Sequence, residues 1–209
     1  MPSLNTHIIA VRHGETAWNK AMRIQGHLDI DLNATGRAQA QAVARGLGNV
    51  SVDAVYSSDL GRAVATATPM AQAKGLVIHQ LPGLRERHFG VWQGETYPDI
   101  EKNHPLEFAR WRDREPAFAV QDAESLVVFQ ERIATVLTTL AVSHAGQTIA
   151  VFTHGGCLDI VYRLAHGIDL AAPRTWSIAN AVVNRLVFDG ERLHCLAWGQ
   201  ADHLDSVEA

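Results

Sequence analysis

Two apolar runs in this 209-residue chain end in glycine and carry reactive residue types at that end. The first run, residues 8–11, leads into Arg12-His13-Gly14, and the second, residues 147–152, leads into Thr153-His154-Gly155-Gly156. A short continuous apolar run ended by glycine is typical of a buried strand that stops abruptly. We therefore predict a buried strand at each run, with the reactive side chains just past its carboxyl end.

Between and after these strands, apolar positions recur at helical spacing. The periodic segments predict helices over about residues 35–47, 63–73, 124–143 and 157–165. We expect Thr35 to cap the first helix and Gly75 to follow the second, because a hydroxyl suits an N-cap and glycine suits a left-handed C-cap. The cap of the long third helix is expected at Asp122 or Ser125.

Further strand patterns complete the outline of the fold. Residues 52–56 and 77–81 form two short apolar runs, and Asp189-Gly190 separates two segments in a way typical of a β-hairpin. Strands that alternate with helices predict an α/β fold, here a three-layer sandwich with a mainly parallel central sheet, a terminal β-hairpin and an inserted lid segment. The spacing of the elements leaves the order of the strands open.

The inserted segment, at about residues 91–120, departs from this alternation. It is rich in tryptophan, proline and arginine, and we interpret it as a lid over the sheet edge within a single domain, residues 1–209. Its large aromatic residues form either the core of the lid or an apolar wall of the site, and they are Trp92, Phe108, Trp111 and Phe118. The basic cluster, which either faces solvent or binds a substrate carboxylate, is Arg110, Arg112 and Arg114.

Composition narrows the class of protein. With 47% hydrophobic residues, the chain can bury a sizeable core. Its formal net charge of −4 gives no electrostatic reason to expect binding to nucleic acid or to an anionic membrane. No apolar run approaches the roughly 20 residues that span a bilayer, and no secretory signal is visible. Cys157 and Cys195 imply no disulfide framework. We expect a cytoplasmic protein without metal or cofactor, a loop over the site at residues 17–32 and a frayed tail from Gln200, with monomer and homodimer both open.

Reactive side chains follow three of the predicted strands. Arg12 and His13 follow the first strand, Arg62 follows the second in chain order, and His154 follows a later one. Because the carboxyl ends of parallel strands can converge on one point, we expect these four side chains to meet. Two guanidinium groups and two imidazoles around one point would hold a dianion, for which a phosphoryl group is the common case. Glu86 can supply the acidic proton that such a site otherwise lacks.

Four motifs make the chain similar to a known family. They are R-H-G-E-T at residues 12–16 with Asn19 after it, S-S-D-L-G-R-A-V-A-T-A at 57–67, L-R-E-R-H-F-G-V-W-Q-G at 84–94 and T-H-G-G at 153–156. In this order they resemble the motifs of the histidine phosphatase superfamily, also called the phosphoglycerate mutase-like family, and of its phosphatase branch. The resemblance covers about residues 8–160.

The resemblance implies a function and a role for each site residue. The protein would be a metal-independent phosphoric monoester hydrolase of the histidine acid phosphatase type, acting on small-molecule phosphate esters. His13 would be the nucleophile that becomes phosphorylated, and Glu86 would be the general acid and then the base that activates water. The residues that would line the phosphate pocket are Arg12, Asn19, Gln25, Arg62, His154 and Gly155 with its backbone amide.

Two patterns of other phosphatase classes also occur in the chain. Cys157 and Arg163 have C-x5-R spacing, and Asp29-Ile30-Asp31 resembles an aspartyl nucleophile pattern. The five residues after Cys157 suit a buried helix rather than a loop of amides around phosphate, and no apolar strand precedes Asp29. We therefore interpret both patterns as accidental. The nine histidines other than His13 and His154 show no metal-ligand spacing and are expected in surface or structural roles.

Two other functions stay open for this fold. A cofactor-dependent phosphoglycerate mutase would have a longer insertion after the acid motif, whereas about thirty residues separate Gly94 from Glu124 here and residues 95–97 depart from the mutase pattern. These departures favour a phosphatase. A catalytically inactive phospholigand-binding protein would have a broken pocket, and no pocket position is broken. The substrate stays open among sugar phosphates, phosphoglycerate, phosphoserine and α-ribazole phosphate.

Overall fold

A mainly parallel sheet of six strands forms the centre of the computed structural model, which describes residues 5–205 and 207. The strands are β1 (Thr6–Arg12), β2 (Ala54–Ser57), β3 (Ile78–Gln80), β4 (Thr148–Thr153), β5 (Val183–Phe188) and β6 (Leu193–Gln200). They lie in the order β3-β2-β4-β1-β5-β6, with β1 to β4 parallel and with β5 and β6 forming an antiparallel hairpin at one edge. The predicted α/β sandwich with a terminal hairpin is confirmed.

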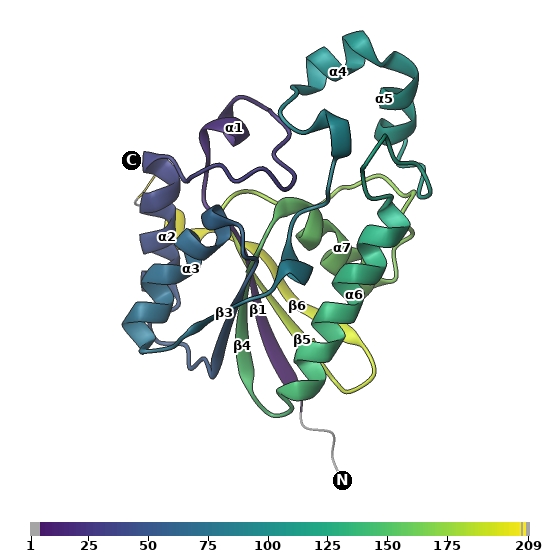
Figure 1. Cartoon of the computed structure of the whole chain (residues 1–209). Helices are drawn as coiled ribbons and strands as arrows, with labels where there is room; N and C mark the ends of the chain where they lie inside the picture. Colours follow the sequence, from purple (N-terminus) through teal and green to yellow (C-terminus); the bar gives the residue numbers. More distant parts are fainter. Residues whose placement is uncertain (1–4, 206, 208–209) are drawn as a thin grey trace.

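Helices cover both faces of this sheet, with α2 and α3 on one face and α6 and α7 on the other (Figure 1). The helices are α1 (Ala17–Lys20), α2 (Ala34–Gly46), α3 (Gly61–Lys74), α4 (Tyr97–Asn103), α5 (Pro105–Arg112), α6 (Leu126–Ser143) and α7 (Gly155–His166). Three short 3-10 turns are η1 (Pro82–Leu84), η2 (Gly90–Trp92) and η3 (Asp202–Leu204).

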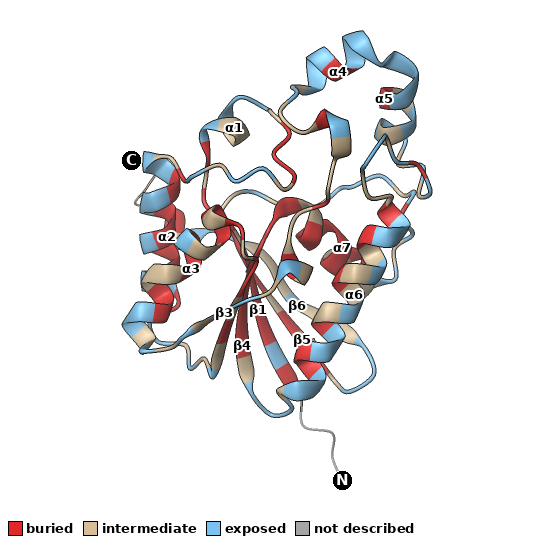
Figure 2. Cartoon of the chain, in the orientation of Figure 1, coloured by how far each residue is buried: buried red, intermediate tan, exposed pale blue. Residues whose placement is uncertain are grey.

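The central strand β1 shows why its sequence is apolar without interruption. Ile8 and Ala10 belong to the core cluster on the α6–α7 side, whereas Ile9 and Val11 belong to the cluster on the α2–α3 side. Successive side chains of a strand point to opposite faces, so a strand covered on both faces needs apolar residues at every position. The inner strands are accordingly buried along most of their length (Figure 2).

Capping residues explain most helix boundaries and correct one prediction. Asn33, not Thr35, is the N-cap of α2, and its side chain accepts a hydrogen bond from Gly36 N at 2.8 Å. Asn33 lies directly before the first helical residue, where a side-chain oxygen reaches the free N–H groups of the first turn. Ser125 caps α6 and Gly75 ends α3 in the left-handed conformation, as predicted.

Two segments near the site are more regular than the sequence suggested. α7 begins at Gly155 rather than at residue 157, because the chain turns into the helix directly after β4. The predicted loop at residues 17–32 begins with the short helix α1, which the capping box of Thr16 and Asn19 starts. Both corrections place helical backbone N–H groups at the carboxyl edge of the sheet.

The C-terminal segment is ordered over most of its described length. β6 extends to Gln200, and η3 follows it with Leu204 buried in the core cluster on the α2–α3 side. The prediction of fraying from Gln200 is therefore wrong for residues 200–205, because an apolar side chain anchors this turn. Residues 206 and 208–209 lie outside the part of the chain that the structure describes.

Helix α6 has 18 residues and a mean hydropathy of 1.4. By length and composition alone it could cross a membrane, so the expectation that no segment approaches that length is corrected. In the fold, Phe129, Ile133 and Leu137 of α6 pack in the core cluster over the sheet. The apolar composition of α6 serves, in this structure, a face buried against the sheet.

The inserted segment lies beyond the carboxyl edge of the sheet and contains α4 and α5 (Figure 1). Its aromatic side chains meet in a third apolar cluster, against which Trp111 packs. The buried members of this cluster are Ile24, Trp92, Ile100, Phe108 and Phe118. Because Ile24 belongs to the loop after α1, this loop and the inserted segment form one layer over the sheet edge.

Candidate active site

His13 lies immediately after β1, and its ring orientation is set by the next residue. His13 Nδ1 and the Gly14 carbonyl oxygen are 2.7 Å apart, and a carbonyl can only accept, so Nδ1 carries the proton. The other ring nitrogen, Nε2, is left with its lone pair toward the cleft that His13 lines. The backbone is also held, because His13 N donates to Thr153 O at 2.9 Å and Asn180 Nδ2 donates to His13 O at 2.9 Å.

His154 lies beside His13, at the corresponding point after β4. The two ring centroids are 5.2 Å apart, and the His154 side chain is fully buried. Neither ring nitrogen of His154 has a hydrogen-bond partner among the described residues. Since a buried polar atom is normally paired, the orphaned ring nitrogens indicate that His154 is available to bind a polar ligand beside His13.

Arg12 and Arg62 bring two guanidinium groups to the same point. Arg12 Nη1 donates to Ile178 O at 2.5 Å, and the two Nη atoms of Arg62 donate to the carbonyls of Leu28 and Gly26 at 2.8 Å each. These carbonyls fix the orientation of both guanidinium groups. The Nε atoms of both arginines are buried and lack an acceptor within the described structure. An anion in the cleft would supply the missing acceptor.

The electrostatics of the site keep both imidazoles neutral. Burial lowers the pKa of His13 well below its usual value, and the charges of Arg12 and Arg62 lower it further. Burial also lowers the pKa of His154, with Arg62 as the next cause. A neutral imidazole retains the lone pair that nucleophilic attack requires.

Glu86 reaches the same cleft from the segment after η1. Its Oε1 accepts from Arg87 N at 2.8 Å, and its Oε2 accepts from Gly156 N, in the first turn of α7, at 2.9 Å. Glu86 and His13 both line the cleft, so the structure brings together the five side chains that we predicted to be catalytic. The remaining requirement for acid–base chemistry is contact with a substrate oxygen.

The other predicted phosphate donors occupy different positions around the cleft. Asn19 Oδ1 accepts from Thr16 N at 3.0 Å in the capping box, which leaves the amide nitrogen of Asn19 as its free donor. Gln25 is buried, and its Oε1 has no partner in the described part of the chain. Gly155 is the first residue of α7 and lies against Arg12, whose Nε would be 3.2 Å from a Cβ at position 155.

The cleft has a volume of about 630 Å³ and is markedly cationic. Its charged lining in the described structure consists of Arg12, Arg23, Arg62, Arg87, Arg112, Arg114, Arg174, Glu86 and Asp159. Seven cations against two acids exceed what one phosphate dianion needs. The sequence prediction missed Arg23, Arg174 and Tyr97, because no motif or strand end marks them.

The basic cluster of the inserted segment divides between two environments. Arg110 forms an exposed ion pair with Glu115 at 2.6 Å, whereas Arg112 and Arg114 line the cleft. Arg114 donates to Asp159 Oδ2 at 2.8 Å and is therefore already paired. Trp111 also lines the cleft, so the predicted aromatic set forms mainly the core of the inserted segment and contributes one side chain to the wall.

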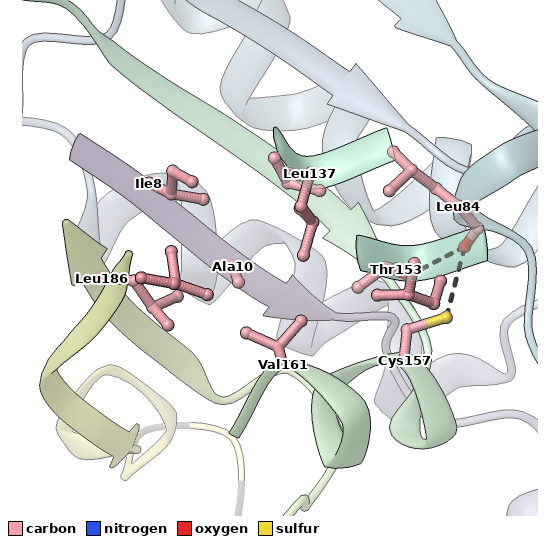
Figure 3. Close-up of a pocket in the computed structure, with 11 residues that line it drawn as sticks. Ile8, Ala10, Leu84, Leu137, Thr153, Cys157, Val161 and Leu186 are labelled. Atoms are coloured by element: carbon pink, nitrogen blue, oxygen red, sulfur yellow. Dashed lines mark hydrogen bonds between the residues drawn. The ribbon is translucent and has the colours of Figure 1, made fainter. Parts of the chain in front are cut away.

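The structure separates the two accidental phosphatase patterns from the cleft. Cys157 points into a small apolar cavity of about 10 Å³ in the core, and its Sγ contacts Leu84 O at 3.5 Å (Figure 3). Burial raises the pKa of the Cys157 thiol well above its usual value, so the reactive thiolate is absent at neutral pH. Arg163 is held by Asp159, and Asp29 accepts from Gly61 N at 2.8 Å as a cap for α3.

The fold and the site together define a class. A three-layer α/β protein presents two neutral histidines, two buried arginines and one glutamate around an anion-sized space at the carboxyl edge of its sheet. The family model of the histidine phosphatase superfamily (branch 1) matches residues 8–201. The chain belongs to this superfamily, as the four motifs indicated.

Relatives in this superfamily match the chain over nearly its whole length. Phosphoglycerate mutase-like protein 4 of Arabidopsis thaliana is 38% identical over 204 residues, covering 96% of this chain and 87% of the relative. The metal-independent phosphoserine phosphatase of the same plant is 34% identical over 206 residues, covering 97% and 84%. Among solved structures, the phosphoserine phosphatase of Entamoeba histolytica in complex with 3-phosphoglyceric acid superposes with a TM-score of 0.85 at 27% identity, covering 95% of this chain and 99% of that chain.

Proposed function

We propose that this protein is a metal-independent phosphatase that hydrolyses small-molecule phosphomonoesters through a phosphohistidine on His13. The observation that carries the proposal is the set of unpaired buried nitrogens on Arg12, Arg62 and His154 around the free Nε2 of His13. Such a set matches the three peripheral oxygens of a phosphoryl group beside a nucleophile. The similarity to the metal-independent phosphoserine phosphatase of Arabidopsis thaliana supports the same chemistry and its independence of metal.

In the first step, the lone pair of His13 Nε2 forms a bond to phosphorus as the bond from phosphorus to the ester oxygen breaks. Glu86 in its protonated form gives its proton to that oxygen, which leaves as an alcohol. Arg12, Arg62 and His154 hold the phosphoryl oxygens throughout the transfer. The Gly14 carbonyl accepts from Nδ1–H and stabilises the positive charge that develops on the ring.

In the second step, the Glu86 carboxylate takes a proton from a water molecule, whose oxygen attacks phosphorus. The bond from His13 Nε2 to phosphorus breaks, and its electron pair returns to the ring. Inorganic phosphate leaves, and Glu86 is again protonated. In a metal-dependent phosphatase, metal ions supply the positive charge that stabilises the phosphoryl oxygens. In this protein arginine side chains supply that charge.

The lining of the cleft also supports a class of substrate. The exposed Arg174, which lines the cleft, has no hydrogen-bond or ion-pair partner among the described residues. The phosphate pocket already contains Arg12 and Arg62, so a further free guanidinium on the rim suits a second acidic group. The substrate class is therefore a small phosphomonoester with a carboxylate near the phosphate, of which phosphoserine and 3-phosphoglycerate are examples.

The proposal is tested by replacing His13 with alanine. We expect wild-type hydrolysis of p-nitrophenyl phosphate to persist in EDTA and to be inhibited by vanadate, which adopts the geometry of the transition state. His13→Ala loses hydrolysis, whereas His79→Ala on the exposed edge strand keeps the wild-type rate. Rapid acid-free quenching with labelled substrate is expected to trap label on wild-type protein and none on His13→Ala. A fully active His13→Ala enzyme would refute the mechanism.

Phosphoryl transfer between substrate hydroxyls is the second candidate, supported by the 38% identity to phosphoglycerate mutase-like protein 4 of Arabidopsis thaliana. The control is 3-phosphoglycerate with its bisphosphate cofactor, followed for both isomerisation and release of phosphate. We expect release of phosphate to dominate. Isomerisation faster than hydrolysis would replace the phosphatase assignment with a mutase.

A further inference from the structure

The segment that carries Glu86 is held in place by a side chain outside the cleft. Arg132, on α6, donates from Nη1 to the carbonyls of Gly83 at 3.0 Å and Arg85 at 2.9 Å, and from Nη2 to the carbonyl of Glu86 at 3.2 Å. One guanidinium thus bonds three carbonyls within four consecutive residues. A planar fork with several donors is suited to such a task, because fixing one plane fixes all of its bonds.

Glu124 completes this arrangement from the other side. Its Oε1 and Oε2 accept from Arg132 Nε and Nη2 at 2.8 and 2.6 Å, and Oε2 also accepts from His88 N at 2.8 Å. The backbone N of Glu124 donates to His88 O at 2.9 Å. The segment from residue 83 to residue 88 is therefore bonded at both ends to one Arg132–Glu124 pair.

The pair is charged and largely shielded from water. The side chains of Arg132 and Glu124 are 23% and 18% exposed. Burial opposes the charged form of Glu124, but the hydrogen bonds from Arg132 and from the backbone of His88 outweigh it and lower the pKa of Glu124. A shielded bidentate pair is stronger and more directional than an exposed one.

Neither member of the pair lines the cleft, so neither is placed to touch a substrate there. The pair is hydrogen-bonded directly to the backbone of Glu86, the proposed acid. The carbonyl of Glu86 accepts from Arg132 and also from His27 Nε2 at 2.7 Å, and the carboxylate of the same residue accepts from Arg87 N and Gly156 N. A shift of this backbone would move the carboxylate away from the leaving oxygen, and a displacement of about 1 Å can cost about 10²-fold in rate.

We infer that the Arg132–Glu124 pair is the positioning element for the general acid Glu86, and that its loss impairs protonation of the leaving group more than any other step. This inference rests on the proposed function. The pair lies outside the cleft and does not touch the substrate. Its part in the reaction is to position Glu86.

The test compares two substrates in variants of the pair. p-Nitrophenolate departs as a stable anion without a proton, whereas the serine alkoxide of phosphoserine needs one, so only the second substrate depends on a well-placed acid at the first step. The value of kcat/KM reports that step, because it covers events up to the departure of the first product. In Arg132→Lys and in Glu124→Gln, we expect kcat/KM for phosphoserine to fall by about 10²-fold and that for p-nitrophenyl phosphate by less than about threefold.

The matched control is Arg110→Lys. Arg110 also forms a bidentate pair with a glutamate, Glu115, but the pair is exposed and lies outside the cleft. Both kcat/KM values are expected to stay at the wild-type level in this variant. Inhibition by vanadate, which needs the phosphate pocket but no proton for a leaving group, should keep its wild-type strength in Arg132→Lys and Glu124→Gln.

Two results would overturn the inference. Equal losses for both substrates, together with weaker inhibition by vanadate, would show that the pair supports the whole site rather than the acid. Unchanged kcat/KM for phosphoserine in both variants would show that the segment keeps its place unaided. Either result leaves the proposed function standing as long as His13→Ala is inactive, so the two failures are distinguishable.

Discussion

At the scale of single residues, the position of Glu86, the proposed acid, depends on a residue without a side chain. A Cβ at position 156 would lie 2.2 Å from Glu86 Oε1, although the backbone N of Gly156 donates to Glu86 Oε2 at 2.9 Å. Two heavy atoms without a bond between them do not approach that closely. The Glu86 carboxylate and the first turn of α7 fit together because residue 156 is glycine.

Replacing Gly156 with alanine is expected to displace the carboxylate and leave the fold intact. The new methyl group meets the end of a flexible side chain, and alanine is favoured over glycine in a helix by up to about 1 kcal/mol. We expect kcat/KM for phosphoserine to fall by at least about 10²-fold, the lower range for general acid catalysis, with an unchanged or higher Tm. Steady-state kinetics and thermal unfolding check both parts. Wild-type kinetics in Gly156→Ala would contradict the role of this contact.

Sequence patterns predicted residues that the structure brings together at the cleft, but they did not predict some of the residues that orient them. His13, His154 and Arg62 could be predicted because they follow apolar strands or belong to recognisable motifs. Asn180, which holds the His13 carbonyl, lies in a connection without periodicity or motif. Its contact joins residues 167 positions apart, and no local pattern encodes a contact of that separation.

At the scale of elements, the connection between α7 and β5 contributes more to the site than its irregular backbone suggests. The carbonyl of Ile178 accepts from Arg12, the side chain of Asn180 donates to the carbonyl of His13, and Arg174 lines the cleft. Strand ends and helix starts carry the predicted phosphate-binding residues Arg12, Arg62 and Gly155, whereas this irregular connection supplies groups that hold them and line the cleft. Binding residues often lie on loops held by a rigid scaffold.

Removal of the free guanidinium of this connection tests the substrate class. We expect Arg174→Ala to raise KM for phosphoserine and 3-phosphoglycerate about tenfold, since a charge-assisted hydrogen bond contributes about 1.5 kcal/mol or more and 1.4 kcal/mol is a factor of ten. KM for glycerol phosphate, which lacks a carboxylate, stays within about twofold. Arg192→Ala, at an exposed position in the β5–β6 hairpin, is the control. An equal rise in KM for all three esters would reject a carboxylate as the partner of Arg174.

At the scale of the whole molecule, the fold keeps histidines neutral by burying them among cations. Burial is the largest cause of the lowered pKa values of His13, His154 and His27. In the unfolded chain these side chains take up protons near pH 6.5, whereas in the folded protein they do so only at lower pH. The unfolded state therefore binds more protons than the folded state once the pH drops below about 6.5.

The consequence is a loss of stability on mild acidification. These histidines leave the free energy of unfolding unchanged above about pH 6.5, where both states are neutral, and lower it as the pH falls, by up to about 1.4 kcal/mol per pH unit and histidine. Urea unfolding at pH 7.5 and 5.5 measures the loss. We expect it to be smaller in His154→Gln and unchanged in His104→Gln, whose side chain is exposed. Equal stability of the wild-type protein at the two pH values would contradict buried neutral histidines.

The carboxylates contribute to stability in a different range. Hydrogen bonding to Arg85 lowers the pKa of Asp59, and the contacts of Glu124 lower its pKa against the effect of burial. Their stabilisation is complete above the unfolded pKa near 4 and is lost only as the pH falls below it. The two classes of group therefore act in separate pH windows, and the interval from 6.5 to 5.5 reports the histidines.

By itself the sequence determined the types of element, the α/β class and the residues expected at the strand ends, because apolar periodicity, caps and strand ends depend on neighbours within a few positions. Only the tertiary structure decided the strand order, the neutral state of the two imidazoles and the place of Arg174 in the lining of the cleft. These properties depend on desolvation and on contacts between residues far apart along the chain. They come into existence only when the strands and connections pack together.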